Sequence, residues 1–218
     1  MKLSKKVRTI LKDKVVVVFG GSDGIGKSIV DLLRTECGSE VYSFSRSENG
    51  IDVTVKSDIL RALDSVGKPI DHIVTTPGYL LVKPFMELSE DDIEYSIEAN
   101  YLSVLSVSQI GYKFLEKRGG SILVFGSTSA FTPRRNYCVY SSLKSAVIAF
   151  AEGLGKEWEG TGVRINCIVP RRTNTKMRFE AFGPEDPKTL LDPGEVARVS
   201  AIVLAGNDSG QMFLVPLP

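Results

Sequence analysis

The sequence predicts a single α/β domain built on a doubly wound parallel sheet, and three observations support this fold class. Strand and helix signals alternate from Lys14 to Val215. The strand segments are continuous apolar runs, as expected where helices cover both faces of a sheet. The chain has 218 residues, of which 43% are hydrophobic and 24% charged, which suits one globular domain. This composition excludes a disordered, collagen-like or coiled-coil chain.

The first half of the chain begins the alternation. Lys14–Phe19 is rich in valine and predicts a strand buried on both faces. The glycine-rich segment Gly20–Gly26 follows as a turn, and apolar residues at helical spacing then predict a helix. The next elements are expected as a strand at Val41–Phe44, an extended segment at Ile51–Val53, a helix over residues 57–66 and a strand at Ile70–Thr75.

The second half continues the same pattern. A long helix is expected from Ser89 to Lys117, because Ser89 is a good N-cap and acidic residues follow it. The irregular stretch from Arg171 to Asp192 is expected to form a loop over the functional site. The remaining elements are expected as a strand at Ser121–Phe125, a helix at Tyr137–Trp158, a strand at Val163–Val169, a helix at Pro193–Leu204 and a strand at Met212–Val215.

Charge and composition set limits on location and partners. Residues 1–13 are basic and predict a solvated lead-in helix or linker before a domain at residues 14–218. The net charge is +1, which argues against nucleic-acid binding through bulk charge, and no apolar run is long enough to span a membrane. Three widely spaced cysteines predict a reduced, cytoplasmic setting, and a single histidine, His72, argues against a metal site.

The glycine-rich turn predicts a nucleotide site. Its spacing is Gly-x3-Gly-x-Gly, and it follows a strand and opens a helix. A turn without side chains lets the backbone approach a pyrophosphate, which the helix N-terminus then stabilises. The spacing does not fit an ATP-binding phosphate loop. The residues of the turn that we expect to contact a cofactor are Gly20, Ser22, Asp23, Gly24, Ile25 and Gly26.

The segment after the second strand predicts which cofactor binds. Ser45 and Arg46 offer a hydroxyl and a guanidinium where an adenosine ribose is expected, which suits a 2′-phosphate. NADP(H) is therefore preferred, with NAD(H) as the alternative. Asp23 opposes this preference because it adds negative charge nearby, and Asp52 with Val53 is expected to contact the adenine.

A Ser–Tyr–Lys set predicts carbonyl chemistry. Tyr140 and Lys144 lie four residues apart on a predicted helix and so share one face. An ammonium beside a phenol is expected to lower the pKa of the phenol, so that it exchanges a proton with a carbonyl or alcohol. Ser127, which follows the preceding strand, is expected to hydrogen-bond the same oxygen.

With these motifs the chain resembles the short-chain dehydrogenase/reductase family from Lys14 to about Val215, which implies a Rossmann-type fold. The resemblance implies that Tyr140 is the general acid, that Lys144 assists it and holds the nicotinamide ribose, and that Asn100 supports Lys144 through a water-linked relay. It also implies a homodimer or homotetramer. Further cofactor contacts are expected at Thr76, Pro77, Gly78, Pro170, Thr173 and Thr175.

Three features depart from the family pattern. Thr75-Thr76-Pro77-Gly78 stands where the family has Asn-Asn-Ala-Gly. Arg171 stands where a glycine usually follows Pro170. The usual glycine-rich ending is absent from residues 215–218, which puts subunit contacts through that tail in doubt.

Cations gather in two segments that should follow strand ends. No acid lies between Gly126 and Ala151 or between Val163 and Arg178. Positive potential there predicts a phosphate or carboxylate substrate, and a solvated loop or contacts with the cofactor phosphates are the alternatives. The same region is poor in large aliphatic residues, which disfavours a steroid. The expected substrate-binding residues are Arg134, Arg135, Arg171, Arg172, Lys176 and Arg178.

The segment from Pro170 to Arg178 is similar to a narrower group, the reductase domain of bifunctional CDP-ribitol synthases. This resemblance implies NADPH-dependent reduction of ribulose 5-phosphate to ribitol 5-phosphate for capsule-like polymers, with a fused or associated cytidylyltransferase. Two alternatives stay open. One is a 3-oxoacyl-carrier-protein reductase, whose cations would dock an acidic carrier protein. The other is a redox sensor that binds NADP(H) without turnover.

Overall fold

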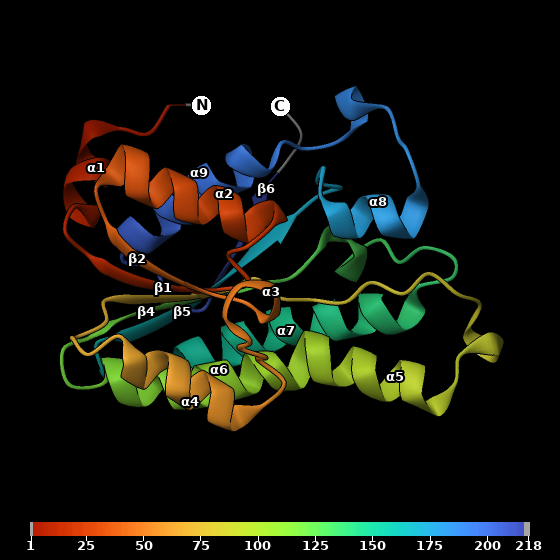
Figure 1. Cartoon of the computed structure of the whole chain (residues 1–218), viewed down its shortest axis with the longest axis horizontal. Coiled ribbons are helices and arrows are strands. Elements are labelled where there is room, and N and C mark those ends of the chain that lie inside the picture. The colour runs from red at the N-terminus through yellow and green to blue at the C-terminus, as the bar shows by residue number, and fades with distance from the viewer. Residues whose placement is uncertain (1, 216–218) are drawn as a thin grey trace.

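The computed structural model describes residues 2–215 and confirms the predicted fold class: one parallel sheet lies between two layers of helices (Figure 1). The strand order is β2-β1-β3-β4-β5-β6, and every neighbouring pair is parallel. The strands are β1 (Val15–Phe19), β2 (Glu40–Phe44), β3 (His72–Thr75), β4 (Gly120–Phe125), β5 (Val163–Pro170) and β6 (Gln211–Val215).

Helices connect the strands and cover both faces of the sheet. In Figure 1, α1, α2 and α9 lie on one face, and α4, α6 and α7 lie on the other. The α-helices are α1 (Lys5–Leu11), α2 (Gly24–Leu32), α3 (Arg46–Asn49), α4 (Lys56–Ser65), α5 (Glu90–Ile97), α6 (Ser103–Leu115), α7 (Cys138–Glu157), α8 (Lys176–Phe182) and α9 (Pro193–Ala205). Short 3₁₀ turns are η2 (Phe85–Glu87), η4 (Thr128–Ala130) and η5 (Pro187–Thr189), and π-helical segments are η1 (Leu33–Cys37) and η3 (Glu98–Leu102).

The valines of β1 divide between two hydrophobic cores. Val17 and Phe19 pack into the core beneath α4, α6 and α7. Val16 and Val18 pack into the core beneath α1, α2 and α9. Alternate residues of a strand face opposite sides of the sheet, so a strand between two cores needs apolar residues at every position. This requirement explains the unbroken valine run.

The strand order reverses beside β1. From β1 the chain crosses to β2 on one side, and from β2 it returns to β3 on the other side of β1. Loops leaving the carboxyl ends of β1 and β3 therefore diverge, which opens a crevice at that edge of the sheet.

The long helix expected over residues 89–117 is present but changes its pitch midway. Ser89 caps α5 through a capping box with Asp92. In η3 the amide of Ser103 donates to the carbonyl of Glu98, a bond that spans five residues instead of four. α6 then continues to Leu115. The π segment contains Asn100, which fixes where that side chain points.

Two expectations about irregular regions need correction. The stretch from Arg171 to Asp192 is not wholly irregular, because Thr175 caps a two-turn helix, α8, that ends at Phe182 and is followed by Gly183. The basic lead-in is a helix, as one of the expected alternatives, but it is not solvated throughout. Leu3 and Leu11 are buried against the α9 side of the sheet, because α1 packs on α9. Within residues 2–215, no helix combines the length and apolar character that a membrane crossing requires.

Candidate active site

A cavity of about 1130 Å³ opens at the carboxyl ends of the strands. Its wall combines the glycine turn, the segment after β2, the ends of β3, β4 and β5, and helices α7 and α8. All expected cofactor-contacting residues lie on this wall: Gly20, Ser22, Asp23, Gly24, Ile25, Gly26, Ser45, Arg46, Asp52, Val53, Thr76, Pro77, Gly78, Tyr140, Lys144, Pro170, Thr173 and Thr175. Residues from distant parts of the sequence therefore share one site.

The glycine turn is held by Thr76 at the end of β3. The Thr76 hydroxyl donates to the carbonyl of Phe19 at 2.9 Å. A Cβ at Gly20 would lie 2.6 Å from Thr76 Oγ1, and one at Gly26 would lie 2.1 Å from the carbonyl oxygen of Gly20. Neither position has room for a side chain. Thr76, although it departs from the family pattern, therefore belongs to the packing of the turn.

The far end of the cavity carries hydroxyls and a guanidinium. Ser47 donates to the hydroxyl of Ser22 at 3.2 Å. Arg46 Nη1 donates to the Tyr95 hydroxyl at 2.9 Å and lies 3.7 Å from Asp52 Oδ2. The Asp23 carboxylate accepts the amide of Gly24 at 2.6 Å. These groups suit an anionic ligand next to a ribose.

Ser127 follows β4 and is arranged to donate a hydrogen bond. Its Oγ accepts the amide of Ser129 at 3.2 Å and the Ser129 hydroxyl at 3.1 Å. A serine hydroxyl has two acceptor lone pairs and one proton. With both acceptor positions in use, Ser127 can act only as a donor, and its proton is directed to the phenol oxygen of Tyr140 on the cavity wall.

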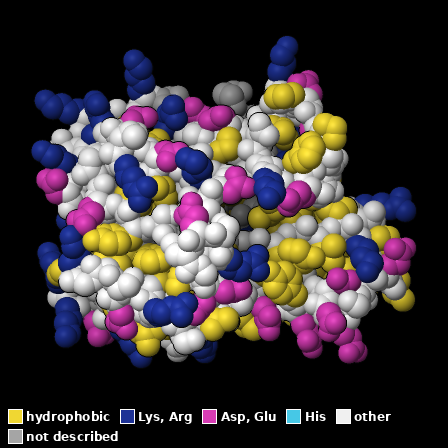
Figure 2. Space-filling model, viewed as in Figure 1, with side chains coloured by type: hydrophobic (Ala, Val, Ile, Leu, Met, Phe, Trp, Pro, Cys, Tyr) yellow, Lys and Arg dark blue, Asp and Glu magenta, His cyan; other side chains and the backbone are white. Residues whose placement is uncertain are grey.

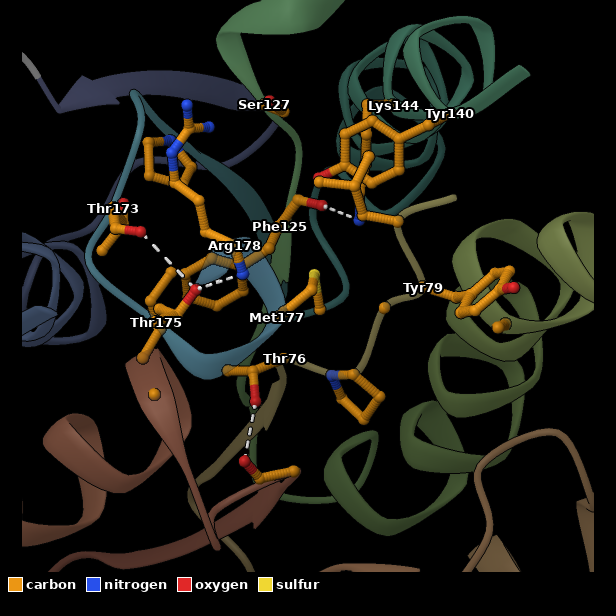
Figure 3. Close-up of a pocket in the computed structure, with 18 of the residues that line it drawn as sticks. Thr76, Tyr79, Phe125, Ser127, Tyr140, Lys144, Thr173, Thr175, Met177 and Arg178 are labelled. Carbon is orange, nitrogen blue, oxygen red and sulfur yellow. Dashed lines mark hydrogen bonds between the residues drawn. The ribbon is translucent and has the colours of Figure 1, made fainter. Parts of the chain in front are cut away.

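Tyr140 and Lys144 lie next to each other on α7 (Figure 3). Burial raises the pKa of Tyr140 to about 12, and a hydrogen bond with Ser127 opposes this change. Burial lowers the pKa of Lys144 to about 8. Lys144 Nζ donates to the carbonyl of Phe125 at 3.1 Å and lies 5.5 Å from the Tyr140 ring centroid. Burial therefore has the larger effect in this structure, and the expectation that Lys144 lowers the pKa of Tyr140 stays a prediction.

Asn100 is placed behind the cavity wall. Its side chain is fully buried, accepts the amide of Tyr79 at 3.1 Å and donates to the carbonyls of Tyr79 and Ser96. A Cβ at Gly78 would lie 3.2 Å from Asn100 Oδ1 and 3.5 Å from Lys144 Nζ. Asn100 and Lys144 thus flank Gly78 without a direct hydrogen bond between them, and a relay between them stays a prediction.

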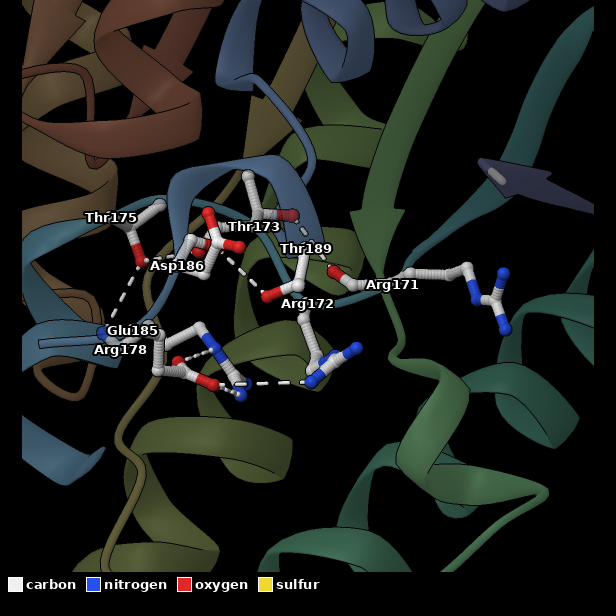
Figure 4. Close-up of polar contacts among 8 residues, drawn as sticks. All are labelled: Arg171, Arg172, Thr173, Thr175, Arg178, Glu185, Asp186 and Thr189. Carbon is white, nitrogen blue, oxygen red and sulfur yellow. Dashed lines mark hydrogen bonds and ion pairs between the residues drawn. The ribbon is translucent and has the colours of Figure 1, made fainter. Parts of the chain in front are cut away.

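The expected substrate-binding cations differ in whether they line the cavity and in whether an acidic side chain pairs with them. Arg134, Arg171, Arg172, Lys176 and Arg178 line the cavity, whereas Arg135 does not and is exposed. Arg178 forms a two-pronged ion pair with Glu185, which also lies 4.0 Å from Arg172 (Figure 4). Within residues 2–215, Arg134 and Arg171 form no ion pair.

These placements bear on two expectations. Arg135 is exposed and does not line the cavity, so its part in substrate binding stays a prediction. The cationic loop is not free of acid, since Glu185 folds back from beyond Arg178. The guanidinium of Arg178 beside it holds the pKa of the Glu185 carboxyl below its usual range. Arg134 also lowers the pKa of Glu185 through its charge, so among the described residues Arg134 and Arg171 are the cavity cations that lie outside close ion pairs.

The cavity wall is also more apolar than expected. Figure 2 shows hydrophobic side chains in a band between α8 and α5. The prediction of a site poor in large aliphatic groups is wrong, because the loop after β3 and helix α8 both contribute such residues. The apolar residues are Leu80, Leu81, Val82, Phe131, Met177, Phe182 and Leu214.

The sequence reasoning missed three polar residues that shape the site. Tyr95 contacts Arg46, Ser129 contacts Ser127, and Glu185 contacts Arg178. For two of them, Tyr95 and Glu185, the sequence contains a pattern that could have indicated the contact. Tyr95 lies four residues before Ala99, so both can line one cavity from the same helix face. Glu185 is the second acid after the cationic run.

The residues present fit a dinucleotide. The positive φ of +54° at Gly24 and the crowding at Gly20 and Gly26 leave a bare backbone where α2 begins. Such a helix N-terminus favours a pyrophosphate. A side chain at Gly78 would enter the space between Asn100, Lys144 and Met177, so a small residue there keeps the catalytic end open.

The fold and site define a short-chain dehydrogenase, and the chain belongs to that family: the family's sequence model matches residues 49–185. It is an oxidoreductase of the dehydrogenase or reductase class. Over 210 residues it is 40% identical to the bifunctional ribulose 5-phosphate reductase/CDP-ribitol pyrophosphorylase Bcs1 of Haemophilus influenzae. That alignment covers 95% of this chain and 44% of Bcs1, so the chain spans less than half of that relative's length.

Other relatives agree on the family and the fold. An uncharacterized short-chain type dehydrogenase/reductase, y4eK of Sinorhizobium fredii, is 31% identical over 82% of this chain and 77% of its own length. The structure of a 3-ketoacyl-(acyl-carrier-protein) reductase from Brucella melitensis complexed with NADH has a TM-score of 0.86, with 18% identity over 94% of this chain and 97% of the other. A small-chain dehydrogenase in complex with NADPH has a TM-score of 0.83, with 20% identity over the same shares. These structural likenesses show the fold alone.

Proposed function

We propose that this protein reduces ribulose 5-phosphate to ribitol 5-phosphate with NADPH. The observation that carries the proposal is a single cavity that holds Ser127, Tyr140 and Lys144 together with Arg134 and Arg171, two cations that form no close ion pair among the described residues. The first group suits a carbonyl and the second suits a phosphate. The 40% identity to a protein named as a ribulose 5-phosphate reductase supports the same substrate.

The cofactor residues follow from the cavity wall. The glycine turn and the start of α2 would hold the pyrophosphate, Arg46 and Ser45 the adenosine ribose with its 2′-phosphate, and Lys144 the nicotinamide ribose. Thr173 and Thr175 would border the nicotinamide end. When bound, NADPH supplies the hydride that reaches the carbonyl carbon.

The protein side of the reaction is proton delivery and orientation. With a pKa of about 12, the phenol of Tyr140 stays protonated at neutral pH and can give its proton to the carbonyl oxygen. Ser127, whose acceptor positions are occupied, donates a second hydrogen bond to that oxygen. Lys144 supplies positive charge beside the ring. One proton and one hydride together complete the reduction of the carbonyl to an alcohol.

The phosphate would lie toward Arg134 and Arg171, with Arg172 as a weaker third contact because Glu185 shares its charge. Arg178 is assigned to loop structure and not to the phosphate, since Glu185 occupies two of its nitrogens. The proposal includes a homodimer or homotetramer and a role in CDP-ribitol and capsule-type polymer synthesis beside a fused or associated cytidylyltransferase.

One assay tests the substrate. NADPH oxidation is measured with ribulose 5-phosphate and with ribulose, in the native chain and in Arg171→Ala. We expect a higher kcat/KM for the phosphorylated sugar, and we expect Arg171→Ala to raise KM for that sugar while leaving ribulose unaffected. Equal activity on the two sugars would contradict a phosphate site.

A second candidate is a 3-oxoacyl-thioester reductase. The apolar wall that includes Leu80, Leu81 and Met177 favours it, because an acyl chain needs apolar contacts. The same assay with a 3-oxoacyl thioester separates the two functions. Turnover of the thioester without turnover of ribulose 5-phosphate would support this second function.

A further inference from the structure

Arg46 and Tyr95 join two separate elements at the edge of the cavity. Arg46 begins α3 after β2, and Tyr95 lies on α5, 49 residues further along the chain. The Arg46 side chain is 66% exposed, so packing alone does not fix it. Its Nη1 donates to the Tyr95 hydroxyl at 2.9 Å. Both residues line the cavity, so this bond fixes an exposed cation on the cavity wall.

The contacts of Arg46 use one edge of the guanidinium. Nη1 meets both the Tyr95 hydroxyl and, at 3.7 Å, Asp52 Oδ2. The other Asp52 oxygen accepts the amide and hydroxyl of Thr54 at 2.9 and 2.8 Å, which fixes the carboxylate. Arginine offers five N–H donors, so Nε and Nη2 remain available on the cavity wall that Ser22 and Ser47 also line.

The position of Tyr95 is itself fixed by contact with Tyr79. Its ring packs edge-on against Tyr79, with centroids 4.8 Å apart and an interplanar angle of 71°. The main chain of Tyr79 is bonded on both sides, through its amide and its carbonyl, to the fully buried Asn100 side chain. The Tyr95 hydroxyl is therefore a fixed point for Arg46.

We propose that Tyr95 is a positioning residue for cofactor selectivity, which holds Arg46 so that its free N–H groups face the 2′-phosphate of an adenosine ribose. The inference rests on the proposed preference for NADPH and deepens it. A guanidinium held in advance loses less conformational freedom when it binds a phosphate. The guanidinium of Arg46 is charged at neutral pH, so its position and not its protonation decides how well it binds a phosphate.

Equilibrium binding of NADP⁺ and NAD⁺, measured by calorimetry without substrate, tests the inference. We expect Tyr95→Phe to weaken NADP⁺ binding about threefold to tenfold, the range expected for one lost hydrogen bond. NAD⁺ lacks the 2′-phosphate, so its Kd should change less than about twofold. Binding of 2′,5′-ADP should weaken with NADP⁺.

A double-mutant cycle separates positioning from a general structural role. On an Arg46→Ala background, adding Tyr95→Phe should have no further effect on NADP⁺ binding, because the hydroxyl then has no guanidinium to hold. Tyr112→Phe is the matched control. It removes the same hydroxyl from α6, where the ring packs on Trp158 away from the cavity wall, and should leave both Kd values unchanged.

The outcomes distinguish this inference from the proposed function. If the native chain binds NADP⁺ no more tightly than NAD⁺, the proposed cofactor preference fails and the role of Tyr95 fails with it. If the native chain prefers NADP⁺ but Tyr95→Phe weakens both dinucleotides equally, or neither, the role of Tyr95 alone is overturned. Additive effects of the two substitutions would overturn it as well.

Discussion

The guanidinium of Arg178 and the carboxylate of Glu185 meet edge to edge, with Nη2 2.8 Å from Oε1 and Nε bonded to Oε2. The same guanidinium lies over the Phe182 ring at 4.5 Å. The two charged side chains are 14% and 21% exposed, so water screens their attraction only in part. This pair closes the chain reversal at Gly183 and fixes the segment that follows α8.

Glu185→Gln should lower the free energy of unfolding. The substitution keeps the shape but leaves a largely buried guanidinium without its counter-charge, which costs about 1–3 kcal/mol. Urea unfolding followed by circular dichroism measures the change. The control is Glu180→Gln, which breaks the ion pair between Lys176 and Glu180. This pair is exposed, with 70% of the Lys176 side chain and 61% of the Glu180 side chain accessible to water. If the two substitutions lower the free energy of unfolding equally, burial does not strengthen the Arg178–Glu185 pair.

Tyr140→Phe should abolish reduction while preserving cofactor binding. The variant keeps the ring beside Lys144 but removes the proton that the carbonyl oxygen must receive. We expect at least a hundredfold loss of kcat, the lower bound for a lost general acid. NADPH fluorescence titration should give an unchanged Kd. Full activity in the variant would remove Tyr140 from the mechanism.

The rate of reduction should fall as pH rises through about 8. Burial lowers the pKa of Lys144 to about 8, so the ammonium beside Tyr140 is present below that pH and lost above it. Tyr140, with a pKa of about 12, stays protonated across the same range and does not contribute to the decline. A pH profile of kcat/KM between 6 and 10, which reports groups of the free enzyme, measures this decline.

Lys144→Arg provides the control for that profile. A guanidinium remains charged over the whole range, so the limb near pH 8 should disappear even where the overall rate is lower. A limb that persists unchanged in Lys144→Arg would assign the titration to another group.

Ser129→Ala should lower kcat about fivefold with little change in KM. The Ser129 hydroxyl occupies one acceptor position of Ser127 Oγ, and without it the Ser127 proton is no longer confined to the cavity side. Steady-state kinetics with the native substrate tests this. Ser142→Ala, on the exposed side of α7, is the matched control and should leave kcat unchanged. If both variants keep the native kcat, Ser129 does not position Ser127.

Stability should fall in acid because of His72. Burial lowers the pKa of His72 from 6.5 to about 4, so the unfolded chain binds a proton that the folded protein excludes. This contribution is complete above pH 6.5 and is lost as pH falls toward 4, by about 3 kcal/mol. His72→Asn should flatten that part of the stability profile. An unchanged slope would assign the loss to carboxylates instead.

The sheet could be predicted because burial on both faces leaves a clear pattern. β1 is apolar at every position, and β5 ends at Pro170, one residue beyond the predicted end at Val169. Tyr140 and Lys144 could be paired because four residues return to the same side of a helix. These features could be predicted because the repeat of a strand or a helix relates residues that are close in the sequence.

The missed features depend on long-range contacts. Glu185 meets Arg178 only because the chain reverses at Gly183, where φ is +73°. Tyr95 and Arg46 are 49 positions apart, and no spacing rule relates them. Arg134 and Arg135 are adjacent in an irregular segment, so the sequence could not tell which one faces the cavity. Thr175 is a favourable N-cap residue and so indicated helix α8. The glycine and prolines around the segment favoured a loop instead.

The π segment between Glu98 and Leu102 holds one residue more than an α-helix would need there. The wider π turn takes one residue more for about the same rotation, so α5 and α6 keep the phase of one continuous helix, and Val104 and Val107 face the sheet. Removing one residue after Asn100 would return the segment to an ordinary α-helix in that phase, but it would change the direction of Asn100 within the turn and disturb its bonds to Tyr79. The extra residue thus gives one polar side chain its own direction while the packing of the rest of the helix is unchanged. In an alignment with chains that lack it, a one-residue gap belongs at this point.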